Sequence, residues 1–371
     1  MRSQTSGRVV LMRPSRWALW GMLGVLLLLC ACAEEPARVV LRGATMGTTW
    51  SVIYAPPPES AKQTKQTKQI ELTGQYSGKR ELQLLIESEL SAINDALSTY
   101  IPESEISRLN AAQATVSQRL SARFAEVLDA ALSLGALTGG AYDVTVGPLV
   151  ELWGFGATTS DRQLPTGEEI ALALENVGAS RLSWNPDTAL LIRPDGMRID
   201  LSSIAKGYAV DRLTSVLQSH GVENALVEIG GELRAMGERP EGGLWRLAIE
   251  SPDPEEGRFI EALNLTDTAV ATSGDYRNYF ELDGRRYSHL VDARTGYPVE
   301  HELVSVTVVD KQCMRADALA TALIILGLDE ALALAQEMGL AAMFVSRAAA
   351  GLDVHYTARF EVYIRQSNPE S

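Results

Sequence analysis

The stretch from residue 225 to residue 309 reads ALVEI at 225–229, LWRLAIE at 244–250, AVAT at 269–272 and VSVTVV at 304–309. Each run is short and rich in apolar or β-branched residues, which is typical of strands. No helix-length pattern separates one run from the next. Because strands follow one another here and do not alternate strictly with helices, the sequence predicts an α+β fold, with mixed or antiparallel sheets packed against helices.

Helical patterns flank this stretch. Apolar residues recur at helical spacing and predict helices at 81–97, 121–137, 168–177, 204–218, 315–326 and 329–338. The second of them stops at Gly139-Gly140, which is a C-cap signal. Further strand-like runs are predicted at 39–54, 189–192, 197–201, 287–291, 341–345 and 360–364. No G-x-G-x-x-G follows a strand and opens a helix, so a Rossmann site is not supported.

The first 31 residues have the pattern of an export signal. Four arginines precede an uncharged run at 17–29, which is shorter than the roughly 20 apolar residues that span a bilayer. Leu29 and Ala31 before Cys32 then resemble a bacterial lipobox, with Cys32 as the lipidated residue. The sequence therefore predicts a signal peptide at 1–31, a tether at 32–38 and a lipid anchor in the membrane. A plain signal peptide with incidental cysteines and a short transmembrane anchor remain alternatives.

The exported part is acidic and poor in cysteine. The formal net charge is −14, and loss of the four signal arginines leaves it near −18, which argues against nucleic acid as a partner. Only Cys313 follows Cys32 in the sequence, so the mature domain has no internal disulfide. The four histidines are scattered without zinc spacing, so a metal site here must be built from oxygen.

One large domain is predicted at 39–365. Residues 55–80 are polar and low in complexity, with KQTKQTKQ at 62–69, and indicate a surface insertion. Residues 366–371 form a short tail.

The helix predicted at 315–326 has the strongest local signal. Asp317 and Thr321 are four residues apart and therefore share one helix face. A carboxylate and a hydroxyl stacked in this way offer two hard oxygen ligands, the type that Mg²⁺ or Ca²⁺ requires. The alternative is structural, with the Asp favoured by the helix dipole and the Thr bonded to a backbone carbonyl.

A second candidate site is the segment DLSSIAKGY at 200–208. A strand is expected to end near Leu201, Ser202 or Ser203 to cap a helix, and Lys206 to lie in its first turn. A cation there opposes the helix dipole, and a bound phosphate would resolve that conflict. In the alternative interpretation Asp200 is a turn residue and Lys206 reaches solvent.

A third candidate is His289, on a strand that is expected to run into the turn at Thr295-Gly296. A histidine of ordinary pKa can serve as a general base near neutral pH. A lone histidine is more often a hydrogen-bonded structural residue, and that alternative stays open.

Taken in order along the chain, these and further segments resemble the family of periplasmic FAD:protein FMN transferases, also known as thiamine-biosynthesis lipoproteins of the ApbE type. The matching segments are MGT at 46–48, LSTY at 97–100 with SE at 104–105, AYDVTVGPLV at 141–150 with WGFG at 153–156, DLSSIAKGY at 200–208, IGG at 229–231, TSGDY at 272–276, HLVDARTG at 289–296 and ADALATA at 316–322. The resemblance covers about 40 to 365. Two departures are Ala293, where the family usually has Pro, and Lys206, whose position varies in the family.

The resemblance implies a Mg²⁺-dependent enzyme with an FAD cleft. It would split FAD at the pyrophosphate, attach FMN through a phosphoester to a Thr of an acceptor protein, and release AMP. The implied acceptors are flavoprotein subunits of membrane redox complexes, and the implied location is a bacterial membrane, on its periplasmic side. Carried over to this sequence, the implied FAD contacts are Met46, Tyr100, Ala141, Tyr142, Asp143, Asp200, Lys206 and Val291. The implied Mg²⁺ ligands are Ser203, Asp317 and Thr321.

The chemistry of these residues agrees with that expectation. Transfer of a phosphoryl-type group needs charge neutralisation and in-line placement of the attacking hydroxyl. Asp317 would bring the metal, and His289 would act as the base for the acceptor Thr, or orient it. Two alternatives remain: a pyrophosphatase that uses water and yields FMN and AMP, and a flavin-binding lipoprotein without enzymatic activity.

Overall fold

The structure is a computed structural model that describes residues 38–56, 78–157, 164–253, 259–276, 278–349 and 351–365. The predicted signal peptide with Cys32, nearly all of the tether, most of the 55–80 insertion and the 366–371 tail lie outside these residues. The described residues belong to one compact unit that begins at Arg38. Among the helices of this described part, none is both long enough and apolar enough to cross a membrane.

The central element is an eight-stranded sheet in the order β1-β2-β6-β7-β10-β13-β14-β15. Every neighbouring pair in it is antiparallel. This confirms the predicted α+β class. Its strands are β1 (Val39–Thr45), β2 (Thr48–Tyr54), β6 (Ala225–Ile229), β7 (Glu232–Met236), β10 (Thr268–Gly274), β13 (Leu303–Asp310), β14 (Ala341–Ala348) and β15 (Gly351–Tyr356).

Three smaller sheets accompany it in the order β3-β5-β4, β8-β9 and β11-β12. Their strands are β3 (Val116–Arg119), β4 (Ser183–Asn185), β5 (Leu190–Arg193), β8 (Trp245–Glu250), β9 (Phe259–Leu265), β11 (Tyr279–Leu282) and β12 (Arg285–Ser288). The helices are α3 (Lys79–Leu97), α4 (Glu105–Ala111), α5 (Ala122–Leu137), α6 (Gly147–Leu152), α7 (Gly167–Leu174), α8 (Ser202–Ser219), α9 (Cys313–Leu326), α10 (Leu328–Glu337) and α11 (Glu361–Arg365), with a short 3-10 turn at Ala179–Arg181.

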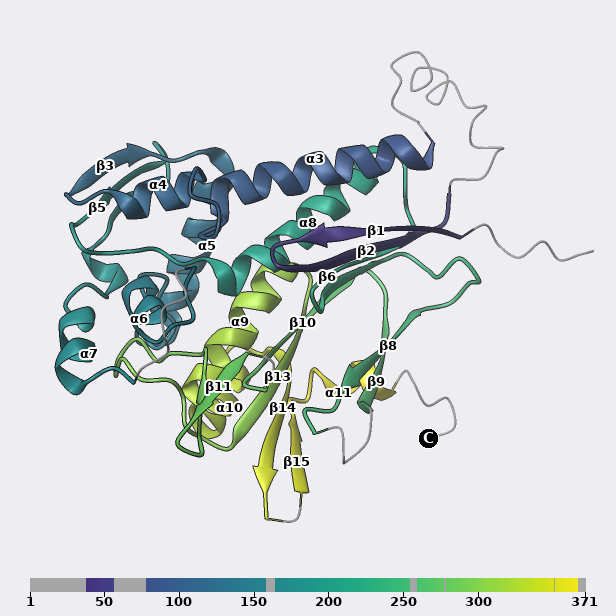
Figure 1. Ribbon diagram of the computed structural model, residues 1–371. Coiled ribbons are helices and arrows are strands. Elements are labelled where there is room, and N and C mark those ends of the chain that lie inside the picture. Colours follow the sequence, from purple (N-terminus) through teal and green to yellow (C-terminus); the bar gives the residue numbers. More distant parts are fainter. Residues whose placement is uncertain are drawn as a thin grey trace, which may run out of the picture. The chain divides into compact units, whose positions relative to one another are not determined.

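The two faces of the large sheet bury two different cores. Helices α3, α8 and α9 pack on one face, whereas the β8–β9 hairpin and α11 pack on the other (Figure 1). Strand β14 shows the two-residue alternation that this requires. Ala342 and Phe344 point into the helix-side core, and Ala341, Met343 and Val345 point into the core beneath the hairpin. The apolar run at 341–345 is therefore continuous because both of its faces are buried.

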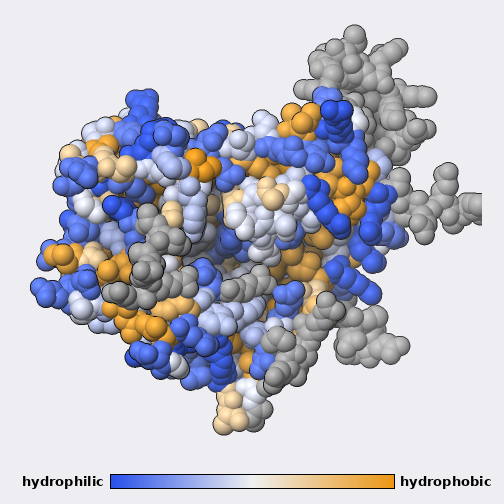
Figure 2. Space-filling view, viewed as in Figure 1, coloured by the Kyte–Doolittle hydropathy of each residue, from blue (hydrophilic) through white to orange (hydrophobic). Residues whose placement is uncertain are grey.

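A third core joins α6 and α7 to the β11–β12 hairpin. Its aromatic rings stack in a chain, with centroids 5.7 Å apart for Trp153 and Tyr287 and 5.2 Å apart for Phe280 and Tyr287. Phe155 packs on Phe280 at 5.4 Å. This aromatic cluster fixes the segment around Phe155 and the segment after β12, which form two walls of the cavity described below. On the side of the molecule that faces the viewer in Figure 1, the surface has separate orange hydrophobic patches among blue hydrophilic areas (Figure 2).

Two predicted strands are wrong. Residues 197–201 do bury alternate apolar side chains, but no strand pairs with them beyond one isolated bridge between Arg198 and Val146. The side chain of Asn110 takes the place of a neighbouring strand, because it bonds both the amide and the carbonyl of Ile199 at 2.8 Å. Residues 361–365 form α11 instead of a strand, since the chain turns at Thr357, whose carbonyl accepts the Phe360 amide at 2.9 Å.

Candidate active site

Helix α9 carries Asp317 and Thr321 on the face that the spacing predicts. The two side chains are only 3% and 8% exposed. Asp317 Oδ2 accepts the backbone amide of Gly207 at 2.9 Å, and Thr321 Oγ1 lies 2.8 Å from Ser273 Oγ on β10. Both residues line the same cavity, so a carboxylate and a hydroxyl are presented together.

The contact between α8 and α9 depends on Gly207. A Cβ at this position would lie 2.3 Å from the Cys313 carbonyl oxygen and 2.8 Å from Asp317 Cβ, closer than real Cβ contacts. The missing side chain lets the two helices touch, which brings the α8 backbone within hydrogen-bond distance of Asp317. The same contact places Lys206, the preceding residue, beside the carboxylate.

Lys206 lies between two buried carboxylates. Its Nζ is 2.7 Å from Glu232 Oε1 and 3.7 Å from Asp317 Oδ1. Burial lowers the pKa of Lys206, but the two carboxylates outweigh burial and hold that pKa above its ordinary value. Burial raises the pKa of Asp317 despite the opposing effects of Lys206 and the Gly207 amide. The sequence predicts Lys206 in the first turn of the helix, but α8 begins at Ser202 and Lys206 lies in its second turn.

The N-terminus of α8 differs from the prediction that Ser202 or Ser203 caps it. Leu201 is the N-cap residue and makes no side-chain cap bond. Instead, Asp200 Oδ1 accepts the Ser202 amide at 2.8 Å and the Ser202 hydroxyl at 2.5 Å. Ser203 is thereby left to hydrogen-bond the hydroxyl of the buried Tyr142 at 3.0 Å, and burial holds the pKa of that Tyr well above its ordinary value.

His289 lies just after β12, not within a strand. Its Nδ1 is 2.9 Å from the backbone oxygen of Asn278, and its own amide donates to the same oxygen at 3.1 Å. A carbonyl oxygen can only accept, so Nδ1 carries the proton and Nε2 keeps its lone pair in the neutral ring. Burial lowers the pKa of His289, and the charge of Lys206 acts in the same direction. The ring is therefore neutral at pH 7 and able to accept a proton.

Ten of the predicted site residues line one cavity of about 340 Å³. They are Tyr100, Tyr142, Asp143, Asp200, Ser203, Lys206, His289, Val291, Asp317 and Thr321. Met46 and Ala141 are not among the described residues that line it. Met46 lies in the β1–β2 turn, next to which Thr48, the first residue of β2, contacts Gly230 of the cavity wall, and Ala141 is fully buried. Sequence reasoning did not single out Glu232, which also lines this cavity and which no local motif marks.

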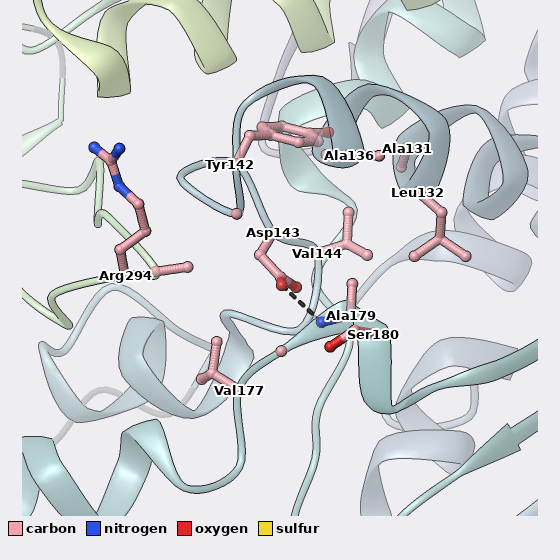
Figure 3. Close-up of a pocket in the computed structure, with 15 residues that line it drawn as sticks. Ala131, Leu132, Ala136, Tyr142, Asp143, Val144, Val177, Ala179, Ser180 and Arg294 are labelled. Atoms are coloured by element: carbon pink, nitrogen blue, oxygen red, sulfur yellow. Dashed lines mark hydrogen bonds between the residues drawn. The ribbon is translucent and has the colours of Figure 1, made fainter.

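A second cavity, of about 600 Å³, lies between α5 and the turn at 178–180 and shares Tyr142 and Asp143 with the first (Figure 3). It is larger, but its charged groups are occupied by the protein itself. Asp143 accepts the amides of Ala179 and Thr145, at 2.7 and 2.8 Å, and Arg294 is paired with Asp292 at 2.8 Å. We therefore assign the candidate active site to the smaller cavity, which holds Asp317, Lys206 and His289.

The donor set in this cavity fits a hard divalent cation. Asp317, Thr321 and Ser203 supply oxygen only, the preference of Mg²⁺. The Asp317 carboxylate is buried and has its nearest cation, Lys206, 3.7 Å away, so its negative charge is not fully compensated. Across the described ranges no cluster of three or more His, Cys, Asp and Glu side chains with metal-binding geometry occurs, so the set would rely on hydroxyl oxygens beside one carboxylate.

Comparisons with known proteins agree on one family. Residues 46–344 match the ApbE family. The FAD:protein FMN transferases of Vibrio cholerae serotype O1 and of Haemophilus influenzae are both 39% identical to this chain, over 342 and 338 residues, covering 92% and 90% of it and 97% and 93% of the relatives. The apo crystal structure of the Pseudomonas stutzeri flavinyl transferase ApbE superposes with a TM-score of 0.78 at 38% identity, covering 90% of this chain and 98% of that one. The chain belongs to the ApbE family.

Proposed function

We propose that this chain is an FAD:protein FMN transferase, which moves the FMN half of FAD onto an acceptor protein. The observation that carries the proposal is that one cavity gathers the buried carboxylate of Asp317, the ammonium of Lys206 and the neutral imidazole of His289. Two relatives that span nearly the whole chain bear this name.

In the proposed reaction an acceptor hydroxyl, in our proposal that of a Thr, attacks the FMN phosphorus of FAD. A phosphoester bond forms, the bond from that phosphorus to the bridging oxygen breaks, and AMP leaves. His289 takes the proton of the attacking hydroxyl on Nε2, since Nδ1 is held by the Asn278 carbonyl. Lys206 stabilises the charge of the diphosphate.

Mg²⁺, held by Asp317, Thr321 and Ser203, would neutralise charge on the diphosphate oxygens. The two hydroxyl groups are already oriented by Ser273 and Tyr142, which lowers the entropy cost of placing them around a cation. Tyr100 is 67% exposed at the cavity and offers an aromatic surface to the flavin or the adenine.

The test is a transfer assay with the full chain, FAD, MgCl₂ and a purified flavoprotein subunit of a membrane redox complex. We expect the intact mass of the subunit to rise by one FMN, less one water, and free AMP to appear. The same subunit with its target Thr replaced by Ala should gain no mass. Free FMN and AMP without a mass change would indicate a pyrophosphatase, and no turnover of FAD at all would indicate a binding protein.

We further propose that Cys32 is lipidated and holds the enzyme on the periplasmic side of a bacterial membrane, near such acceptor complexes. The pattern of an export signal and of a lipobox supports this, and it agrees with the membrane subunits that we propose as acceptors. In cells that process lipoproteins, the Cys32→Ser variant should partition into the soluble fraction. Unchanged membrane partitioning of that variant would contradict the anchor.

A further inference from the structure

Glu232 is a cavity residue to which the proposed reaction gives no task. It opens β7, directly after the turn at Gly230-Gly231, and its side chain is 3% exposed. Oε1 accepts from Lys206 at 2.7 Å, whereas Oε2 is buried and has no hydrogen-bond partner in the described structure. Burying a carboxylate with one unpaired oxygen costs free energy, unless an ion pair at the other oxygen offsets that cost.

The partner is Lys206, and it is shared. Its ammonium lies 2.7 Å from Glu232 and 3.7 Å from Asp317, so two carboxylates compete for one cation. Asp317 also has the Gly207 amide at 2.9 Å. Without Glu232, the ammonium would have Asp317 as its only nearby carboxylate among the residues that line the cavity wall here.

A divalent cation at Asp317 changes this competition. The cation and the ammonium would both be attracted to the same carboxylate and would repel each other at short range. The ammonium can leave Asp317 at low cost only if another anion is already in place. Glu232 meets that requirement, because it is closer to Lys206 than Asp317 is and still has an unpaired oxygen.

We propose that Glu232 is a positioning residue that holds Lys206 away from Asp317, which leaves this carboxylate open to a divalent cation and keeps the ammonium directed into the cleft. This inference rests on the proposed function for the identity of the cation. Glu232 acts through Lys206 and is not itself a ligand of the metal.

The test is a double-mutant cycle on cation binding. The affinity of each variant is measured by calorimetric titration of the FAD-free protein with MgCl₂ alone. We expect Glu232→Gln to weaken Mg²⁺ binding about 10-fold, the size of effect seen for residues that orient a metal ligand. Glu232→Asp, which keeps the charge, should restore most of the affinity. Lys206→Met should bind Mg²⁺ at least as tightly as the wild type, and adding Glu232→Gln to it should cause no further loss.

Glu228→Gln is the matched control. Glu228 lies in the same β6–β7 hairpin but bonds Ser51 and the Gly231 amide, outside the cavity, so its loss should leave Mg²⁺ binding unchanged. Two results would overturn the inference: equal weakening by Glu232→Gln with and without Lys206, which would make Glu232 a direct ligand, or no weakening in a folded variant. If the wild type itself bound no Mg²⁺, the proposed Mg²⁺ site would fail instead, whereas the transfer assay tests the proposed function separately.

Discussion

Two glutamates of this protein, the partly buried Glu89 and the buried Glu232, have opposite electrostatic surroundings. Glu89 joins the helices of one face of the sheet, where Oε1 accepts from Arg212 at 2.9 Å and Oε2 from Arg123 at 2.7 Å. Glu232, in the cavity, has one oxygen on Lys206 and one without a partner. Burial alone would raise the pKa of both carboxyls.

The net pKa shifts then differ in sign. At Glu89 the hydrogen bonds from two arginines outweigh burial and lower the pKa, whereas at Glu232 burial prevails over Lys206 and raises it to about 7. Glu89, which serves the fold, has each oxygen paired with an arginine. Glu232 instead shares its one cation, Lys206, with Asp317, so this pair of carboxylates is short of positive charge, which a cation bound at Asp317 would supply. We call the pairing of Glu89 with Arg123 and Arg212 the closed network, and the shared pairing of Lys206 with Glu232 and Asp317 the open network.

The largest effect is expected from Asp317→Asn. The amide keeps the shape and an acceptor for the Gly207 amide, but it removes the negative charge on which we base the cation site. Loss of several kcal/mol of charge stabilisation corresponds to a fall in kcat of roughly 10³-fold or more. FMN transfer, followed by the acceptor's mass, checks this. The variant should unfold in urea near the wild-type midpoint, and a fully active variant would contradict an open site at Asp317.

The next effect concerns His289→Gln, which keeps a hydrogen-bond donor for the Asn278 carbonyl but has no basic nitrogen. Removal of a general base costs about 10²-fold or more in rate. The pKa of His289 is below its ordinary value of 6.5, so protonation of this ring should reduce wild-type kcat with a midpoint below pH 6.5. The variant should lack this decline. The same decline in the variant as in the wild type would exclude His289 as the base.

A third prediction tests whether the open network depends on the close approach of two helices. Gly207→Ala places a methyl group against the Cys313 carbonyl, so α8 and α9 must separate. We expect a loss of about 1–3 kcal/mol in the free energy of unfolding, as for other overpacked positions, measured by urea denaturation. Transfer activity should fall as well, because Asp317 would lose its bond to the α8 backbone. The control is Ala125→Gly on α5, which measures the effect of exchanging glycine and alanine within a helix. Gly47→Ala would not serve, since Gly47 has a positive φ.

The sequence predicts the helices and strands best where one periodic signal dominates. The spacing of Asp317 and Thr321 determines their common face on α9, and the resemblance marks most of the cavity lining. The strand expected at 197–201 fails because its alternation reflects burial alone, and its polar partner is the distant side chain of Asn110. Glu232 escapes prediction for a similar reason. Its position beside Lys206 results from the packing of β7 on α8, a tertiary contact that no local pattern encodes.

The smallest effect is expected in the closed network, from Glu89→Gln. Because both arginine partners are partly exposed, the loss should be only about 1 kcal/mol in the free energy of unfolding at pH 7. The folded pKa of Glu89 is below its ordinary 4.5, so the carboxylate stabilises the fold above pH 4.5, and this contribution disappears as the pH falls through the folded pKa. The difference between wild type and variant in urea should therefore be constant from pH 8 to 5 and shrink below 4.5. FMN transfer should stay within about two-fold of wild type, since a 1 kcal/mol loss leaves the protein folded. A difference that grows in acid would contradict the lowered pKa of Glu89, and a large loss of activity would mean that this network is coupled to the cavity.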